Sequence, residues 1–300
     1  MAKMTDTSGS KPFKGFSYSL GGTLLVSTSY VTAKYGMAGF NPNTFALIWS
    51  SAAALYAFVI VLATGYQHLF LSSRSAVRVT CMGLAAGASM ILAWQGLSRL
   101  DPLFASFIWR FQPVLTIAFG IHLLGERLLL KEIFAISVMV IGGCISTISV
   151  WDIVGVGTVL TIFACFTVTI QMLIAKKESS TVHCNALTFY RVFIAAGAIA
   201  LYCFFAGDCN FDVEPSFWLV TLIGAFLAPC ASFLLTFRAY RYWELSRVNM
   251  LKTIQPLFVL PMAYLVFGKI PGGSTLFGGL LILIGALWLS WIHLRRSDVS

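Results

Sequence analysis

Three basic residues inside long apolar stretches are the side chains of this sequence most able to do chemistry. They are Arg110, Arg191 and Lys252, and the apolar stretches that contain them hold no Asp or Glu. Burying one Arg or Lys in a bilayer costs about 2.5–3.5 kcal/mol on insertion scales, so each must be solvated by a cavity, by backbone or by a ligand. Together they favour an anionic ligand held within an apolar structure.

The depth of each basic residue leaves two interpretations open. Arg191 and Lys252 lie about two helical turns from one edge of their stretches, and at that depth a long side chain can instead extend its charge to the membrane interface. Arg110 lies about two turns from the opposite edge, just before Gln112 and Pro113. We therefore predict that Arg110 faces a cavity and meets a substrate anion there.

Amide and aromatic side chains at similar depths complete the predicted substrate path. Gln112 and Gln255 each precede a proline in the middle of an apolar stretch and could face a wet cavity. Packing or a position at the membrane interface is the alternative for the aromatic residues. The other candidates are one glutamine and four aromatic residues: Gln95, Tyr30, Trp94, Trp109 and Tyr190.

Composition requires a membrane environment for these residues. The chain is 58% hydrophobic and 10% charged, with a mean hydropathy of +0.86, and a soluble domain could not cover so much apolar surface. Ten stretches of about 20 residues are long enough to span a bilayer. They lie near Phe16–Met37, Asn43–Thr64, Val77–Leu97, Pro102–Leu124, Leu128–Ser149, Val154–Ile174, Cys184–Ala206, Ser216–Phe237, Ser246–Phe267 and Ser274–Ile292. We predict an all-α integral membrane protein of ten transmembrane helices.

An internal repeat divides the ten helices into two halves. The stretch 84–142 recurs without a gap at 227–285, with paired Gln-Pro, Ser and Gly positions. Because each half holds an odd number of helices, the second half is inverted relative to the first, which is typical of alternating-access transporters. We assign residues 1–15 and 294–300 to cytoplasmic tails and residues 16–150 and 151–293 to the two inverted five-helix repeats.

Pro113 and Pro256 stand at the same position of the two repeats. Each removes a hydrogen bond inside its helix and weakens the helix locally. We predict that both are hinges of the moving parts, with a static kink as the alternative.

The distribution of charge predicts the orientation. With the amino terminus inside, fourteen Lys or Arg residues fall on the cytoplasmic side and three, Lys34, Arg99 and Lys269, on the other. This positive-inside bias places both termini in the cytoplasm, and we expect the inner membrane of a bacterium. Basic loops separated by bilayer spans cannot form one nucleic-acid groove. Of the seven cysteines only Cys209 is expected to face outward, so no disulfide framework is predicted. The fourteen inner residues are Lys3, Lys11, Lys14, Arg74, Arg78, Arg127, Lys131, Lys176, Lys177, Arg238, Arg241, Arg247, Arg295 and Arg296.

A local motif carries a resemblance to a known family. Pro102, Ala105 and Ser106 begin the fourth helix, Gln112-Pro113 interrupts it, and Gly125-Glu126-Arg127 ends it. This pattern resembles EamA-type ten-helix members of the drug/metabolite transporter superfamily, and the helix number and duplication extend the similarity to nearly the whole chain. The second half departs from the motif at Leu245, Val248, Asn249 and Gly268-Lys269-Ile270.

The resemblance implies secondary transport of a small molecule. Small multidrug exporters similar to this family use a membrane-embedded Glu. The one acidic residue within these spans is Glu132, near the start of Leu128–Ser149, so cation antiport is disfavoured. The sugar-phosphate and nucleotide-sugar branches carry basic residues on the fourth and ninth helices, but this chain has Lys252-Thr253 in place of their doubled basic pair. We predict an exporter of a carboxylate-bearing metabolite, such as an amino acid or derivative, with a sugar-phosphate or nucleotide-sugar exchanger as the alternative.

Other classes of function are less compatible with the sequence. A phosphate-binding loop, a zinc-protease motif and a nucleophile elbow are all missing, so we expect neither enzyme activity nor a cofactor or metal. A non-transporting scaffold or lipid scramblase remains a further alternative. The expected partners are the small-molecule substrate and the lipid bilayer, and a homodimer is compatible with the sequence.

Overall fold

The computed structural model describes residues 10–112, 115, 119, 130–148, 151–206, 209–243, 245–252, 254–268 and 272–297, which form helices and short connections without a strand. Every predicted span coincides with helical residues, although the fourth is described continuously only as far as Gln112. The helices are α1 (Ser10–Gly36), α2 (Pro42–Thr64), η1 (Tyr66–Leu69), α3 (Ser73–Arg99), α4 (Pro102–Ile108), α6 (Leu130–Ile148), α7 (Trp151–Glu178), α8 (Cys184–Ala206), α9 (Pro215–Ala225), η2 (Phe226–Ser232), α10 (Phe233–Ala239), α11 (Leu245–Lys252), α12 (Gln255–Phe267) and α13 (Gly273–Ser297).

Local sequence signals explain where these helices begin and end. The Asn41 side chain accepts a hydrogen bond from the Thr44 backbone N–H at 2.7 Å, and Pro42 occupies the first turn of α2, as is common at helix starts. At the carboxyl end of α12, the capping residue Gly268 has φ of 63°, a left-handed conformation that glycine adopts without a steric penalty.

The outer surface of the bundle is apolar, as a bilayer requires. Leu55, Val59, Phe193 and Leu201 are all exposed on the long helices α2 and α8. In the part of the chain that the structure describes, five helical segments are long and apolar enough to cross a membrane. Together with the ten helical spans, this confirms the predicted integral membrane fold.

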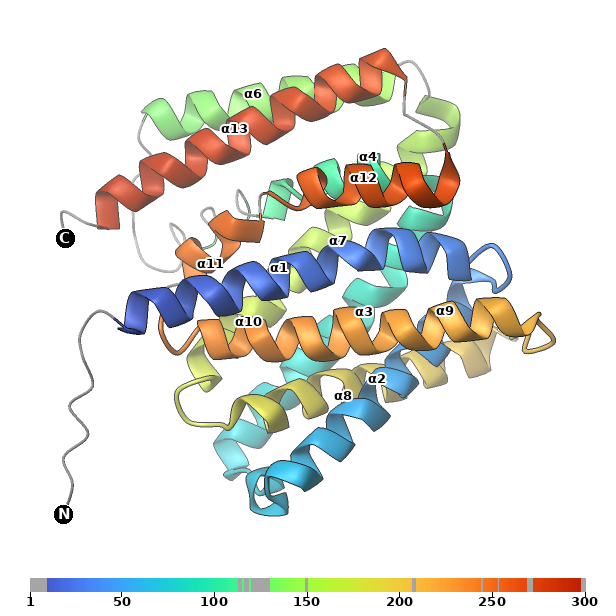
Figure 1. Cartoon of the computed structure of the whole chain (residues 1–300), viewed down its shortest axis with the longest axis vertical. Coiled ribbons are helices and arrows are strands. Elements are labelled where there is room, and N and C mark those ends of the chain that lie inside the picture. The colour runs from blue at the N-terminus through green and yellow to red at the C-terminus, as the bar shows by residue number, and fades with distance from the viewer. Residues whose placement is uncertain are drawn as a thin grey trace.

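The last helices of the two repeats, α6 and α13, demonstrate the inverted relation directly. They lie side by side at one edge of the molecule (Figure 1). A Cβ added to Gly142 of α6 would lie 2.6 Å from the Gly278 carbonyl oxygen, and one added to Gly285 of α13 would lie 2.8 Å from the Ala135 carbonyl oxygen. In the sequence repeat Gly142 is equivalent to Gly285 and Ala135 is equivalent to Gly278, so each close approach is the symmetry equivalent of the other. The helices therefore cross antiparallel about a pseudo-twofold axis, at the two positions where a side chain would not fit.

Two lysines repeat this symmetry at opposite ends of the bundle. Lys34 of α1 donates to the backbone oxygens of Leu97 and Leu100 at 2.9 and 2.8 Å, where α3 ends. Lys176 of α7 donates to the oxygens of Tyr240 and Trp243 at 2.6 and 2.9 Å, where α10 ends. Each lysine neutralises the carbonyl end of a helix.

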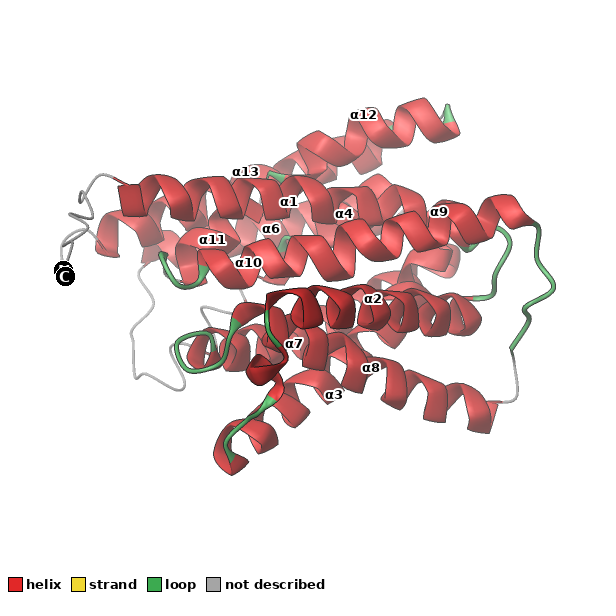
Figure 2. Cartoon of the chain, turned by 60° about the horizontal axis from the view of Figure 1, so that its bottom comes forward, coloured by secondary structure: helices red, strands yellow, loops and turns green. Residues whose placement is uncertain are grey.

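Three predicted spans are interrupted rather than continuous. The eighth comprises α9, the π-helical segment η2 around Pro229, and α10. The ninth breaks between α11 and α12, immediately before Gln255 and Pro256. In the fourth, α4 ends at Ile108 and a turn at Trp109 and Arg110 follows. Figure 2 shows α11 and α12 as separate helices. In the sequence repeat Trp109, at the turn of the fourth span, is equivalent to Lys252, the last residue of α11, so the two breaks fall at corresponding positions. Pro113, the other predicted hinge, lies outside the described residues.

The predicted orientation leads to a labelling experiment on intact cells. Cys209 is exposed in the connection before α9, and Cys81 is exposed on α3, where the bilayer would cover it. We expect a membrane-impermeant thiol reagent added outside to label the wild-type chain, and Cys209→Ser to abolish that signal. Ser180 is exposed in the connection between α7 and α8, so Ser180→Cys in the Cys209→Ser background should be labelled only after permeabilisation. Labelling of that variant in intact cells would reverse the assigned orientation.

Candidate substrate-binding cavity

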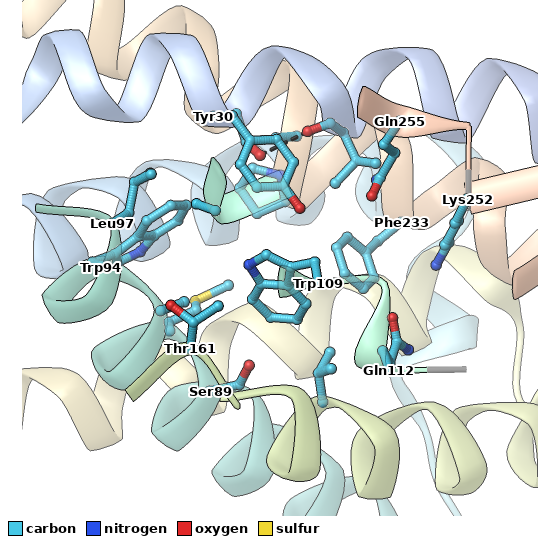
Figure 3. Close-up of a pocket in the computed structure, with 18 of the residues that line it drawn as sticks. Tyr30, Ser89, Trp94, Leu97, Trp109, Gln112, Thr161, Phe233, Lys252 and Gln255 are labelled. Carbon is cyan, nitrogen blue, oxygen red and sulfur yellow. Dashed lines mark hydrogen bonds between the residues drawn. The ribbon is translucent and has the colours of Figure 1, made fainter. Parts of the chain in front are cut away.

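A cavity lies at the centre of the bundle, between the two repeats. It measures about 860 Å³, including the part open to solvent, and residues from α1, α2, α3, α4, α7, α8, η2, α10, α11 and α12 line it (Figure 3). The interrupted spans therefore meet around this cavity.

Seven of the ten predicted substrate-path residues line this cavity, and three do not. Arg110, Gln95 and Tyr190 lie outside the lining. Contact with a substrate stays a prediction for all ten. The seven in the lining are Tyr30, Trp94, Trp109, Gln112, Arg191, Lys252 and Gln255.

Arg191 and Lys252 bring two positive charges to one aromatic ring. The Arg191 Cζ atom lies 3.3 Å from the centroid of the Phe233 ring, and the Lys252 Nζ atom lies 5.6 Å from the same centroid. Arg191 is 3% exposed and Lys252 is 8% exposed. The alternative that these side chains extend to the membrane interface is therefore wrong, because a head group at the interface would be accessible to solvent.

The hydrogen bonds of these two cations are incomplete. Arg191 Nη1 donates to the Pro229 carbonyl oxygen at 3.1 Å, but the buried Arg191 Nε has no partner. Among the described residues, the Lys252 ammonium contacts the Phe233 ring and donates no hydrogen bond. The ion pair between Arg78 and Glu178 joins α3 to α7 elsewhere. Phe233 gives cation–π stabilisation, which leaves donor groups available to a bound anion.

Arg110, the residue predicted most firmly to meet a substrate anion, has other partners. Its guanidinium donates to the Lys252 carbonyl oxygen and to the Gln255 side-chain oxygen, both in the opposite repeat. Its Nε donates to the Ser106 carbonyl oxygen at 3.1 Å. Because protein oxygens occupy these donors and Arg110 is 3% exposed behind the cavity wall, the geometry favours a positioning role.

Pro256 explains why the Lys252 carbonyl needs this partner. In a continuous helix the oxygen of residue 252 would accept from the N–H of residue 256, but proline has no N–H. The break between α11 and α12 therefore leaves a buried carbonyl, and Arg110 satisfies it from the other repeat. One arginine thus connects the interrupted fourth span to the interrupted ninth span.

The other two residues outside the lining also have protein partners. Gln95 donates to the Asn43 side-chain oxygen at 2.9 Å and accepts from Arg99 at 2.9 Å. The Tyr190 hydroxyl donates to the Leu69 carbonyl oxygen at 2.7 Å, which fixes α8 to η1. Both interactions stabilise contacts between elements.

One end of the cavity is aromatic and the other is cationic (Figure 3). At the aromatic end, the rings of Trp49 and Trp94 meet edge to face with centroids 5.3 Å apart, a favourable arrangement for indoles. Lys252 and Gln255 lie at the other end, with Trp109 between the two ends.

Sequence reasoning missed several lining residues, among them Phe233 and Pro229. Pro229 offered a usable signal, since a proline in the middle of a span interrupts the helical hydrogen bonds, and π-helical segments are frequent at functional sites. Phe233 follows directly after that segment. Nothing in the local sequence distinguishes it from the other phenylalanines of the chain.

A bundle of two inverted five-helix repeats, with a central cavity beside interrupted helices, is the architecture of a membrane transporter. The chain belongs to the EamA-like transporter family, whose family model matches residues 13–148 and again residues 155–291. Members of this family transport small solutes across membranes and are not enzymes. The two matched segments correspond to the two repeats.

A solved crystal structure supports the fold over the whole chain. It superposes with a TM-score of 0.66 at 17% sequence identity, covering 97% of this chain and 99% of the other. At that identity the similarity concerns the fold alone. No significant match is found among curated proteins.

Proposed function

We propose that this protein exports a small carboxylate-bearing metabolite, such as an amino acid or a derivative, by alternating access. It acts in the cytoplasmic membrane of a bacterium with both termini inside. The observation that carries the proposal is the pair of buried cations, Arg191 and Lys252, in the wall of the central cavity.

The chemistry of the cavity supports an anionic cargo. Among the described residues no Asp or Glu lines the cavity, so an entering carboxylate would be the counter-ion of the two cations. A buried charge is stabilised far more by a paired opposite charge than by neutral groups. A substrate that brings this charge is therefore bound in preference to a neutral one of equal size.

The interrupted helices support alternating access. The fourth and ninth spans both break beside the cavity, at equivalent positions of the inverted repeats. Such breaks let the two halves of a helix tilt separately while lining groups stay at the substrate. Because the two repeats are related by a pseudo-twofold axis, exchanging their conformations would open the cavity to the opposite side.

Flux in proteoliposomes that contain only this protein tests the proposal. We expect saturable uptake for members of a carboxylate panel that includes amino acids and their deaminated analogues, with little uptake into protein-free liposomes. Faster uptake into everted than into right-side-out membrane vesicles would support export. The charge of the two cations also suits a phosphate, so glucose 6-phosphate and a nucleotide sugar form a second panel.

The outcomes separate the alternatives. Saturable flux of the phosphorylated compounds alone would replace the carboxylate with a sugar-phosphate class. Flux of an organic cation alone would overturn the anionic cargo. Lipid scrambling, or no solute flux in either panel, would favour the scaffold or scramblase alternative.

A further inference from the structure

We infer that the substrate is an amphipathic aromatic carboxylate without an ammonium group, bound with its acid beside Lys252 and its ring between Trp94 and Trp109. This inference rests on the proposed function and narrows its substrate class. The inference distinguishes an aromatic acid from the corresponding amino acid, which carries an additional ammonium group.

The cationic end of the cavity provides donors for the acid. Lys252 lies there beside the side-chain amide of Gln255 (Figure 3), and Arg191 meets the same Phe233 ring from α8. The buried Arg191 Nε lacks a partner. A carboxylate has two oxygens that can accept from several donors, so one acid group can pair with the donors at this end.

The same end disfavours an ammonium group. An α-ammonium is attached next to the carboxylate, so it would enter the same end and face both cations. Serine, threonine and glutamine oxygens are available as neutral acceptors, but the part of the lining that the structure describes contains no carboxylate to neutralise the ammonium. Like charges at close range repel more strongly in a low-dielectric protein site than in water. The cavity therefore suits a net negative charge better than a zwitterion.

The other end of the cavity fits a planar apolar group. Trp94 contacts both Trp49 and Phe45 edge to face, with ring centroids 5.3 Å apart in each pair. These contacts hold the indole rigidly at the cavity wall. The buried Trp94 Nε1 has no hydrogen-bond partner, so this end also offers one donor to a substituent of a ring. Aromatic side chains held in this way provide stacking and edge contacts to a bound ring.

The sequence repeat places an aromatic residue and a cationic residue at equivalent positions. Gln112 and Gln255 occupy equivalent positions, whereas Trp109 of the first repeat is equivalent to Lys252 of the second. An indole and an ammonium thus stand at matching places on the two sides of a pseudo-symmetric cavity. This difference between the repeats matches a substrate with one aromatic end and one anionic end.

A matched set of four ligands tests the inference by calorimetry on the purified protein. The reference ligand is 3-phenylpropionate. Relative to it, phenylalanine adds the ammonium group, phenethylamine replaces the acid by an amine, and propionate lacks the ring. We expect 3-phenylpropionate to bind at least about tenfold more tightly than each of the others. Each charged-group change disturbs a charge-assisted hydrogen bond that contributes this much or more, and removal of the ring loses a comparable free energy of apolar burial.

Two variants assign the preference to the two ends of the cavity. Lys252→Gln should weaken 3-phenylpropionate by about tenfold to a hundredfold and reduce its advantage over phenylalanine. Trp94→Leu should weaken 3-phenylpropionate several-fold and leave propionate unchanged. A merely structural defect would lower the affinities for all four ligands together.

The results that would overturn the inference differ from those that would overturn the proposed function. Phenylalanine binding as tightly as 3-phenylpropionate would refute the exclusion of the ammonium group, while transport of carboxylates would stand. Propionate binding as tightly would refute the aromatic site in the same way. Tightest binding of phenethylamine would refute both. If none of the four binds, the inference fails, and the carboxylate flux alone decides the proposed function.

Discussion

Lys252→Met should make the protein more stable and at the same time remove its ability to bind an anion. Lys252 is 8% exposed and has no carboxylate partner among the described residues, and its ammonium shares the Phe233 ring with Arg191. Burying a Lys costs about 2.5–3.5 kcal/mol on insertion scales, so an apolar side chain of similar length should return roughly 1–3 kcal/mol of that cost. Loss of the charge should lower affinity for a carboxylate substrate by about tenfold to a hundredfold.

Two measurements on purified protein check this opposite response. Thermal stability is followed by the fraction that remains monodisperse after heating, and affinity is followed by ligand titration. Lys252→Arg is the matched control, because it keeps the charge and should keep a large part of the affinity without the gain in stability. A fall in stability for Lys252→Met would show instead that the ammonium stabilises the fold, which would remove the principal support for an anion site.

A gain in stability with a loss of function is characteristic of a group kept for function. Proteins retain unfavourable features at sites where activity requires them. Arg191 is a less clean test of the same idea, because its hydrogen bond to the Pro229 oxygen and its contact with Phe233 also hold α8 against the eighth span.

Hydropathy and the internal repeat predicted the fold of this chain, because both can be identified in the sequence without knowing which helices are neighbours. A span needs only length and apolarity, and the repeat needs only matching residues such as Gly142 and Gly285; that these two glycines lie where α6 and α13 cross is shown by the structure. The Gln-Pro pairs likewise indicated weak points in the fourth and ninth spans, since a proline in the interior of a helix removes a hydrogen bond.

The direction of each basic side chain could not be predicted in the same way. Arg110 and Lys252 both lie beside a helix break at similar depth, and the neighbouring Gln112 and Pro113 favoured Arg110 as the residue that faces the cavity. The structure turns Arg110 toward protein oxygens and Lys252 toward the cavity. Whether a basic side chain pairs with protein oxygens or faces the cavity depends on the helix packed against it, and that helix comes from the other repeat. The partner that decides the outcome for Arg110 is the carbonyl oxygen left over by Pro256.

Arg110→Met should therefore respond in the opposite sense to Lys252→Met. It removes the donors for the Lys252 carbonyl and the Gln255 side chain, and a buried polar group left without a partner costs about 1–3 kcal/mol. Removal of the buried charge itself offsets part of this loss. We expect a net decrease in thermal stability and a decrease in transport. If Arg110→Met is as stable as the parent and only loses affinity, Arg110 contacts the substrate directly and the positioning role is wrong.

A double-mutant cycle with Pro256→Ala isolates the contact between the two repeats. Alanine at 256 restores the N–H that can donate to the Lys252 oxygen within a continuous helix, so this oxygen no longer depends on Arg110. Arg110→Met should then cost less stability in the Pro256→Ala background than in the parent, with a coupling of about 0.5–2 kcal/mol, in keeping with interhelical hydrogen bonds in membranes and contacting residues generally. Pro256→Ala alone should slow transport while preserving yield, because a continuous ninth span cannot bend beside the cavity. If the two changes are strictly additive, Arg110 does not substitute for the hydrogen bond that Pro256 removes, and its link between the interrupted spans has another cause.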